Sequence, residues 1–392
     1  MKISLKKYLL FSSVFAIFTE SFFFHFIIDW KLLYLIIFVN YILLLQIKKI
    51  SINKYFAVFI FALFVHGFLA NIIIGIPPNY MISQLLGILV VSTFYYNLIP
   101  IYKKEDIIAS YLKICVIITI IGYLMFMLNL QKYEDQLHSI FKEPAHYVVV
   151  ILPACYYFFK KKQFFLFLIL FFSLILSKSS LGYIGCAIIF IMPYLTLRKI
   201  LALILTIPII IYVGFLTYEN NENFKLRIDD TVSSLNSINS GKFKSDTNVS
   251  SYALMSNLYV AKNNFIEHPL GSGIGSHVYM HKNFYLKKMT PPEYIKTLKL
   301  QNINATDANS LFLRLFSELG VFGLGFILLF LYHFSFCFKY EDLIIAQGIF
   351  IYIVLKLIRD GHYFSPEIYF FIWILYYSLL DKKINTNSHK IH

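Results

Sequence analysis

Long apolar runs separated by short polar loops recur along most of this chain. An apolar helix of roughly 17 to 25 residues is long enough to cross the hydrocarbon layer of a membrane. The pattern therefore indicates an all-α, polytopic membrane protein with about twelve membrane-spanning helices. The predicted spans cover residues 8–28, 31–47, 55–76, 80–99, 107–128, 144–159, 163–177, 180–197, 200–217, 309–337, 343–359 and 366–380.

One long polar insert, residues 218–308, interrupts this pattern. It divides the chain into residues 1–217, which carry the first nine predicted spans, the insert itself, and residues 309–392, which carry the last three spans and a tail. Within the insert, apolar residues at helical spacings predict a helix over residues 251–266, with Ser250 or Ser251 as its N-cap. A helix of this kind can lie along the membrane face.

Basic residues in the short loops predict the orientation of the chain. Five loops that fall on one side of the predicted membrane hold most of them, at Lys48, Lys49, Lys54, Lys103, Lys104, Lys160, Lys161, Lys162, Arg198, Lys199, Lys382 and Lys383. The positive-inside rule makes that side cytoplasmic. By alternation both termini are cytoplasmic, and the insert faces outward together with the segments near Asp29, Pro77, Glu143, Lys178 and His362.

Composition narrows the functional classes. Hydrophobic residues make up 58% of the 392 residues and charged residues only 14%, so too little polar sequence remains for a separate soluble domain beyond the insert. The chain has 35 basic and 21 acidic residues, but the excess lies in short loops, and no nucleic-acid partner is expected. The four cysteines lie in apolar runs, which predicts neither a disulfide nor a zinc site.

Ionisable side chains in the outward segments are the candidates for chemistry. An ionised group near the middle of the bilayer costs ~2.5 to 3.5 kcal/mol, so such groups are predicted to line a shared cavity instead. Glu143 and His146 lie at the outer end of a span, where Glu143 could accept a proton or simply favour the helix dipole. Lys178 could neutralise a lipid phosphate or extend to the interface.

A second group of candidates lies in the insert and in the segments after it. Asp307 and Asn309 precede a span in which Arg314 and Glu318 share one helix face, as an intrahelical ion pair or as part of a site. Arg359 and His362 lie between the last two spans, in a site or a solvated loop. The insert adds Arg227 and His277, which are either site or surface residues. The glycines at 271, 273 and 275 could cradle a phosphate, but they match no nucleotide-binding fingerprint.

At these positions the chain resembles the bacterial O-antigen polymerases of the Wzy type, within the wider family of O-antigen polymerases and ligases. The resemblance rests on the order of four segments and on the single long outward loop before the final three spans. The segments are FKEPAHY at 141–147, LSKSSLGYIG at 176–185, NNFIEHPLGSGIGSH at 263–277 and NSLFLRLFSELGVFGLG at 309–325.

The resemblance implies a GT-C-like membrane enzyme of the bacterial inner membrane that polymerises undecaprenyl-diphosphate-linked repeat units at the periplasmic face. It implies donor and acceptor glycans on that lipid, no metal, nucleotide or other cofactor, and a chain-length regulator and flippase of the same pathway as partners. Such a reaction needs a proton acceptor and cations on the leaving diphosphate. The expected diphosphate contacts are Arg314, Lys178 and Arg227, and the expected proton acceptor or sugar ligand is Glu143, Asp307 or His277.

Two departures from the family pattern bear on the choice among functions. Family members often carry His-Asn where this chain has Asp307, Ala308 and Asn309, which argues against an O-antigen ligase acting on lipid A core. Many carry an arginine beside the Ser-rich step, where this chain has Lys178. A flippase or other transporter would also have about twelve spans. Such a transporter would seldom need so long an external insert.

Overall fold

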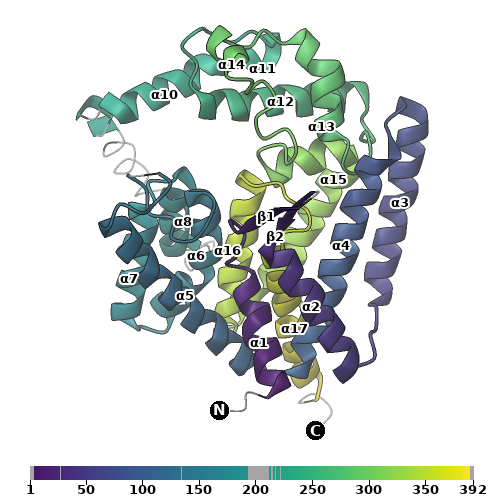
Figure 1. Cartoon of the computed structure of the whole chain (residues 1–392), viewed down its shortest axis with the longest axis vertical. Helices are drawn as coiled ribbons and strands as arrows, with labels where there is room; N and C mark the ends of the chain where they lie inside the picture. The colour runs from purple at the N-terminus through teal and green to yellow at the C-terminus, as the bar shows by residue number, and fades with distance from the viewer. Residues whose placement is uncertain are drawn as a thin grey trace.

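The computed structural model describes residues 4–388 apart from 27, 134, 193–211, 213, 214, 217 and 221. The described part is a helical bundle, with a layer of shorter helices lying across one end (Figure 1). Its helices are α1 (Leu5–Ala16), α2 (Leu32–Ile47), α3 (Lys54–Ile74), α4 (Pro78–Leu98), α5 (Lys104–Met127), α6 (Pro144–Lys160), α7 (Phe164–Leu176), α8 (Ser180–Ile191), α10 (Glu222–Ser234), α11 (Ser237–Ser240), α12 (Val249–Glu267), α13 (His277–Met280), α14 (Glu293–Thr297), α15 (Leu311–Ser335), α16 (Ile344–Ile358) and α17 (Pro366–Ser388).

The helical, membrane-type architecture is confirmed, but a count of about twelve spans is not. Four helical segments among the described residues are long and apolar enough to cross a membrane: Lys54–Ile74, Pro78–Ile101, Lys104–Met127 and Leu311–Lys339. Helices α2, α7, α8 and α16 are apolar but shorter. The predicted span at 200–217 lies outside the described residues except for 212, 215 and 216.

The continuous span predicted at 8–28 is wrong. Helix α1 ends at Ala16, and an antiparallel hairpin of β1 (Phe23–Phe26) and β2 (Ile28–Lys31) follows it. The hydroxyl of Thr19 donates to the carbonyl of Ala16 at 2.9 Å, which meets one of the acceptors left open at the helix end. Beyond it, Glu20 lies 2.6 Å from His146 and 3.4 Å from Lys31. Glu20 therefore lies outside any helix and has two charged partners.

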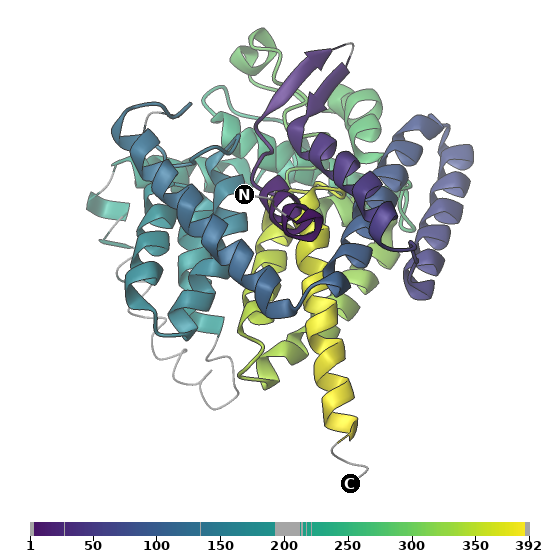
Figure 2. The same ribbon diagram turned by 60° about the horizontal axis from the view of Figure 1, so that its bottom comes forward.

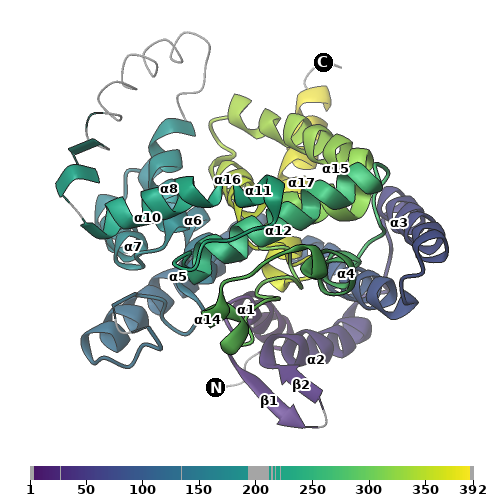
Figure 3. The ribbon, with the colours of Figure 1, turned by 90° about the horizontal axis from the view of Figure 1, so that it is seen from above.

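The insert forms the layer across the end of the bundle, opposite the end at which α1 begins and α17 ends (Figures 1 and 2). Helix α12 crosses this end above α16 and α17, as the view from above shows (Figure 3). The helix predicted at 251–266 is confirmed, although its N-cap is Asn248, whose side chain accepts from the backbone N–H of Ser251 at 2.9 Å. The insert thus lies at the opposite end of the described structure from the start of α1 and the end of α17.

A kink in α15 allows the insert to form backbone hydrogen bonds with this helix. Gly320 interrupts the helix with a φ of 57°, and a side chain there would lie 2.0 Å from the carbonyl of Pro269. The insert chain fills the gap, because Val321 N–H donates to Pro269 O at 3.0 Å and Gly273 N–H donates to Glu318 O at 2.8 Å. The glycine loop therefore packs against the helix backbone.

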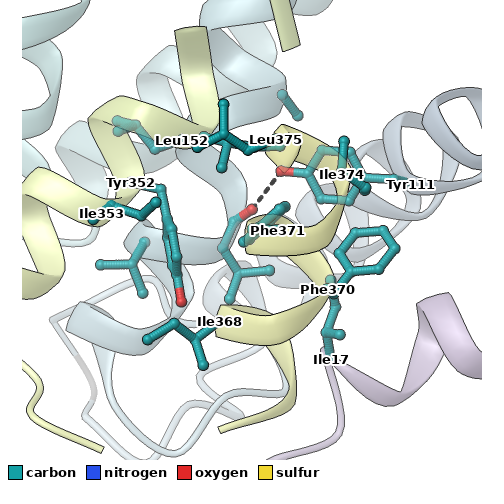
Figure 4. Packing of buried hydrophobic residues seen from close by; sticks show 14 of the residues in the cluster. Ile17, Tyr111, Leu152, Tyr352, Ile353, Ile368, Phe370, Phe371, Ile374 and Leu375 are labelled. Atoms are coloured by element: carbon teal, nitrogen blue, oxygen red, sulfur yellow. Dashed lines mark hydrogen bonds between the residues drawn. The ribbon is translucent and has the colours of Figure 1, made fainter. Parts of the chain in front are cut away.

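Aromatic packing holds the centre of the bundle together (Figure 4). Tyr111 of α5 meets Phe371 of α17 edge to face, with ring centroids 5.4 Å apart. Its buried hydroxyl donates to the backbone carbonyl of Val150 in α6 at 2.6 Å. Helices α5, α6, α16 and α17 are joined here into one core, from which the polar ends of α6 and α16 extend toward the insert.

A candidate polar cleft beneath the insert

A polar cleft lies between the start of α12 and the insert-facing ends of α6, α8 and α16. It has a larger compartment of about 620 Å³ and a smaller one of about 90 Å³. Glu143, Ala145 and Arg359 line both compartments, so the two are adjacent. The remaining lining residues of the larger compartment are Tyr133, Gln136, Pro144, Lys178, Ser179, Ser180, Asn248, Ser250, Ser251, Leu254 and Met255.

The cleft brings together most of the residues singled out from the sequence. Lys178 faces the larger compartment with Glu143 and Arg359. The predicted residues lining the smaller compartment are Glu143, His146, Asp307, Asn309, Arg359 and His362. Three separate parts of the chain thus contribute to the small compartment, and one of them is the end of the insert. This convergence is what the sequence predicted for a shared cavity.

Arg359 and Lys178 are the accessible cations that line the larger compartment, and the exposed Lys142 lines the smaller one. Arg359 is half-buried, and the described residues form no ion pair with its guanidinium. Lys178 has a half-exposed side chain that lies 3.9 Å from the exposed carboxylate of Asp135, and its backbone has a φ of 46°. An exposed ion pair of this kind contributes little to the stability of the fold. Both cations are therefore able to meet an anionic ligand.

His146 lines the smaller compartment and forms an ion pair with Glu20. Its Nδ1 lies 2.6 Å from Oε2 of Glu20, and the other oxygen of Glu20 lies 3.4 Å from Lys31. Burial raises the pKa of the Glu20 carboxyl, but the charges of His146 and Lys31 outweigh it and hold that pKa below its usual range. Glu20, to which the sequence analysis assigned no role, is thus a carboxylate that keeps a positive charge on His146.

Two loops meet at the floor of the smaller compartment. Asp360 N–H donates to Asn309 O at 3.3 Å, and the hydroxyl of Ser310 donates to Leu357 O at 2.7 Å. A side chain on Gly361 would lie 1.9 Å from the carbonyl of Asp307, so only glycine permits this approach. Ala308, Asn309 and Asp360 have φ values of 55°, 58° and 70°. Backbone strain of this kind concentrates at functional sites.

A buried lysine holds Asp360 in place. Lys356 lies in the apolar helix α16, is fully buried, and donates to Asp360 at 2.6 Å and to Glu367 at 3.3 Å. Burial raises the pKa of Asp360, but the Lys356 ammonium outweighs it and lowers that pKa to about 2. The sequence analysis missed Lys356, although a lone lysine inside an apolar run is a recognisable signal of a buried partner.

Potential metal-binding atoms come close together at the same place. Among the described residues, Asp307, Asp360 and His362 form the one group whose donor atoms all lie within 4.8 Å of one another. The Lys356 ammonium already neutralises Asp360, and it would repel a divalent cation bound at this point. We therefore interpret the group as an acid–base cluster.

Arg314 and Glu318 do not line the cleft. Their side chains are 2% and 1% exposed, and Arg314 Nε lies 3.2 Å from Glu318 Oε1. The guanidinium also donates to Gly361 O at 2.8 Å and to Gln84 Oε1 at 2.9 Å, and it stacks on the ring of Tyr363 at 3.9 Å. Arg314 thus supports the loop that carries Asp360 and His362. Its guanidinium is enclosed by these partners and is not available to bind a diphosphate.

The glycine loop and His277 are also internal. Glu318 accepts from the N–H of Gly275 at 2.6 Å and from that of His277 at 3.2 Å, so these amides are not free to hold a phosphate. The His277 ring is fully buried, with Nε2 3.1 Å from Asn257 Oδ1. The structure does not place His277 in the cleft. The side chain of Arg227, in α10, lies outside the described residues.

The buried histidines of the insert predict a pH-dependent fold. Burial lowers the pKa of His281 from 6.5 to about 4, and it lowers that of His277 as well. A depressed histidine pKa stabilises the fold above pH 6.5, and this stability is lost as the pH falls toward 4. For His281 alone the loss from pH 7 to pH 5 is roughly 2 kcal/mol. Limited proteolysis should therefore cut the insert faster at pH 5, and His281→Leu should reduce that pH sensitivity.

Comparison with known families gives one match. Residues 165–328 match the model of a family described as O-antigen ligase. Over these residues the chain is similar to that family. The matched region includes Lys178, Asp307 and the whole insert, whereas Glu143 and Arg359 lie outside it. A comparison with curated proteins finds no match. The resemblance to the O-antigen polymerase and ligase family is thereby confirmed, and the matched family implies a glycosyltransferase-like enzyme.

Proposed function

We propose that the protein polymerises undecaprenyl-diphosphate-linked oligosaccharide repeat units at the periplasmic face of the bacterial inner membrane. The cleft carries this proposal, because it combines accessible cations with carboxylates and imidazoles at the end of the bundle opposite the start of α1 and the end of α17. Lipid-linked glycan transfer needs positive charge near the leaving diphosphate and a proton acceptor near the attacking hydroxyl. The energy resides in the lipid diphosphate, so no nucleotide is required.

The geometry keeps Lys178 as an expected diphosphate contact and favours Arg359 in place of Arg314. We assign the diphosphate to Arg359 and Lys178, which flank the larger compartment and are accessible. Glu143 lies between the two compartments, where its carboxylate can bind hydroxyls of the acceptor sugar. Arg314 becomes a positioning residue in this proposal, because its guanidinium is enclosed. Arg227 stays a prediction from the sequence.

A ligase that transfers glycan to lipid A core is the second candidate, because the matched family is described by that activity. It would use the same donor and the same cleft and would differ only in its acceptor. The sequence Asp307, Ala308 and Asn309, in place of His-Asn, is the feature that favours polymerase. A flippase would share the membrane architecture, but it needs no proton acceptor.

A reconstituted transfer assay tests the proposal. The purified chain in liposomes receives the lipid-linked repeat unit that accumulates in its host cell when its own gene is deleted, with no added nucleotide. A ladder of products that grow by one repeat unit is the expected result. A single transfer that requires added lipid A core would show a ligase, and movement across the bilayer without new glycosidic bonds would show a transporter.

A further inference from the structure

Two imidazoles reach the smaller compartment, and their surroundings differ. His146 is held at 2.6 Å by the Glu20 carboxylate and carries a positive charge, so it cannot accept another proton. His362 lies across the compartment, half-buried, and the described residues form no ion pair with its ring. Its backbone N–H donates to Asp360 Oδ1 at 3.2 Å. His362 is therefore the imidazole that is free to accept a proton.

The carboxylates around His362 are less suited to that task. Asp360 is held by the Lys356 ammonium, and its low pKa makes it a weak base. Asp307 accepts from the N–H of Asn309 at 3.2 Å, and one of its carboxylate oxygens lies within 4.8 Å of a ring nitrogen of His362. A general base works best when its pKa lies near the operating pH, which favours an imidazole over a carboxylate. The other charged groups at the compartment or near it are Lys31, Lys142, Glu143, His146 and Arg359.

We propose that His362 is the general base of the transfer reaction, with Asp307 and Asp360 orienting its ring and stabilising the imidazolium that forms. This assignment rests on the proposed function. The loop that carries Gly361 packs closely against the loop that carries Asp307. This contact places the His362 ring at the smaller compartment. Burial outweighs the nearby carboxylates and lowers the pKa of His362, so the ring is neutral and ready to accept a proton at neutral pH.

The proton and electron movements then balance within the cleft. An acceptor sugar hydroxyl attacks the anomeric carbon of the donor glycan, and the bond from that carbon to the diphosphate oxygen breaks. Both electrons of that bond leave with the lipid diphosphate, whose charge meets Arg359 and Lys178. The hydroxyl proton passes to His362 and from there to solvent. One glycosidic bond forms, one phosphate ester bond breaks, and no oxidant, reductant or nucleotide takes part.

Chemical rescue tests this assignment. His362→Ala removes the ring and leaves a space into which free imidazole can enter. With the lipid-linked repeat unit from the host deletion strain in liposomes, we expect the initial transfer rate to fall at least about 100-fold, which is the usual contribution of a general base. Added imidazole should restore the rate in proportion to its unprotonated concentration. A merely structural role of His362 would not give this response.

The matched control is His268→Gln, at the far end of α12 from the cleft. It should transfer at the wild-type rate and should not respond to imidazole. The assignment is overturned if His362→Ala stays within threefold of wild type, or if the folded variant is inactive and imidazole does not restore it. Failure of the wild-type chain to form any product overturns the polymerase proposal itself, so the two failures are distinct.

Discussion

Replacing Arg359 with methionine should slow glycan transfer at least about 100-fold, which is the usual effect of removing one charge-stabilising group from a transition state. Arg359 is the guanidinium shared by both compartments, and it has no ion-pair partner among the described residues. It is therefore free to meet the charge that develops on the leaving diphosphate. The initial rate of product formation from the lipid-linked repeat unit measures the effect.

Two further variants test whether the slower transfer in Arg359→Met results from the loss of positive charge at this position. Arg359→Lys keeps the charge but loses the bidentate fork, so it should retain part of the activity. Lys299→Met removes a cation from the insert that does not line the cleft, and it should transfer at the wild-type rate. Normal rates in Arg359→Met would remove this residue from the site and leave Lys178 as the accessible cation of the larger compartment.

Replacing Arg314 with methionine should destabilise the protein by ~3 to 5 kcal/mol, because removal of one partner leaves a buried charge without compensation. Glu318 would keep its contacts with the backbone N–H groups of Gly275 and His277 but would lose its guanidinium. The carbonyl of Gly361 would also lose its donor, which loosens the loop that carries His362. Thermal unfolding in detergent measures the first effect, and the transfer rate measures the second.

The exposed pair Lys296–Glu293 is the matched control. Its N–O distance is 2.7 Å, close to the 3.2 Å of the buried pair, but both side chains are accessible. Lys296→Met should therefore cost less than ~1 kcal/mol. An Arg314→Met protein with wild-type stability and no activity would contradict the positioning role. That result would return Arg314 to direct contact with the diphosphate, as the sequence alone suggested.

Outward polar segments could be predicted from the sequence because membrane topology leaves few alternatives. Apolar runs fix which loops share a face, and polar groups avoid the hydrocarbon layer. Glu143, Asp307, Arg359 and His362 could thus be assigned to one face before their contacts were known, and the structure brings them to one compartment. Helix α12 was equally predictable, because its apolar spacing and its Pro269 stop are local signals.

Burial within that face could not be predicted in the same way. The sequence suggested that Arg314 faces a polar cavity, because it lies more than one turn inside the predicted span. The kink at Gly320 instead admits the glycine loop, which encloses the ion pair. Glu20 looked like a lone carboxylate inside a span, because nothing local shows that α1 ends at Ala16 and turns Glu20 toward His146. Both outcomes depend on contacts between residues far apart in the chain.

The central claim is that a lipid-linked glycan binds in the cleft beneath α12, and site-specific photocrosslinking tests it most directly. A benzophenone amino acid replaces Leu254, which lines the larger compartment, or Leu298, which is exposed elsewhere in the insert. The labelled lipid-linked repeat unit should crosslink to position 254, and excess unlabelled unit should abolish that crosslink, whereas position 298 should stay unlabelled. Equal labelling at both positions, or labelling at position 298 alone, would contradict the account.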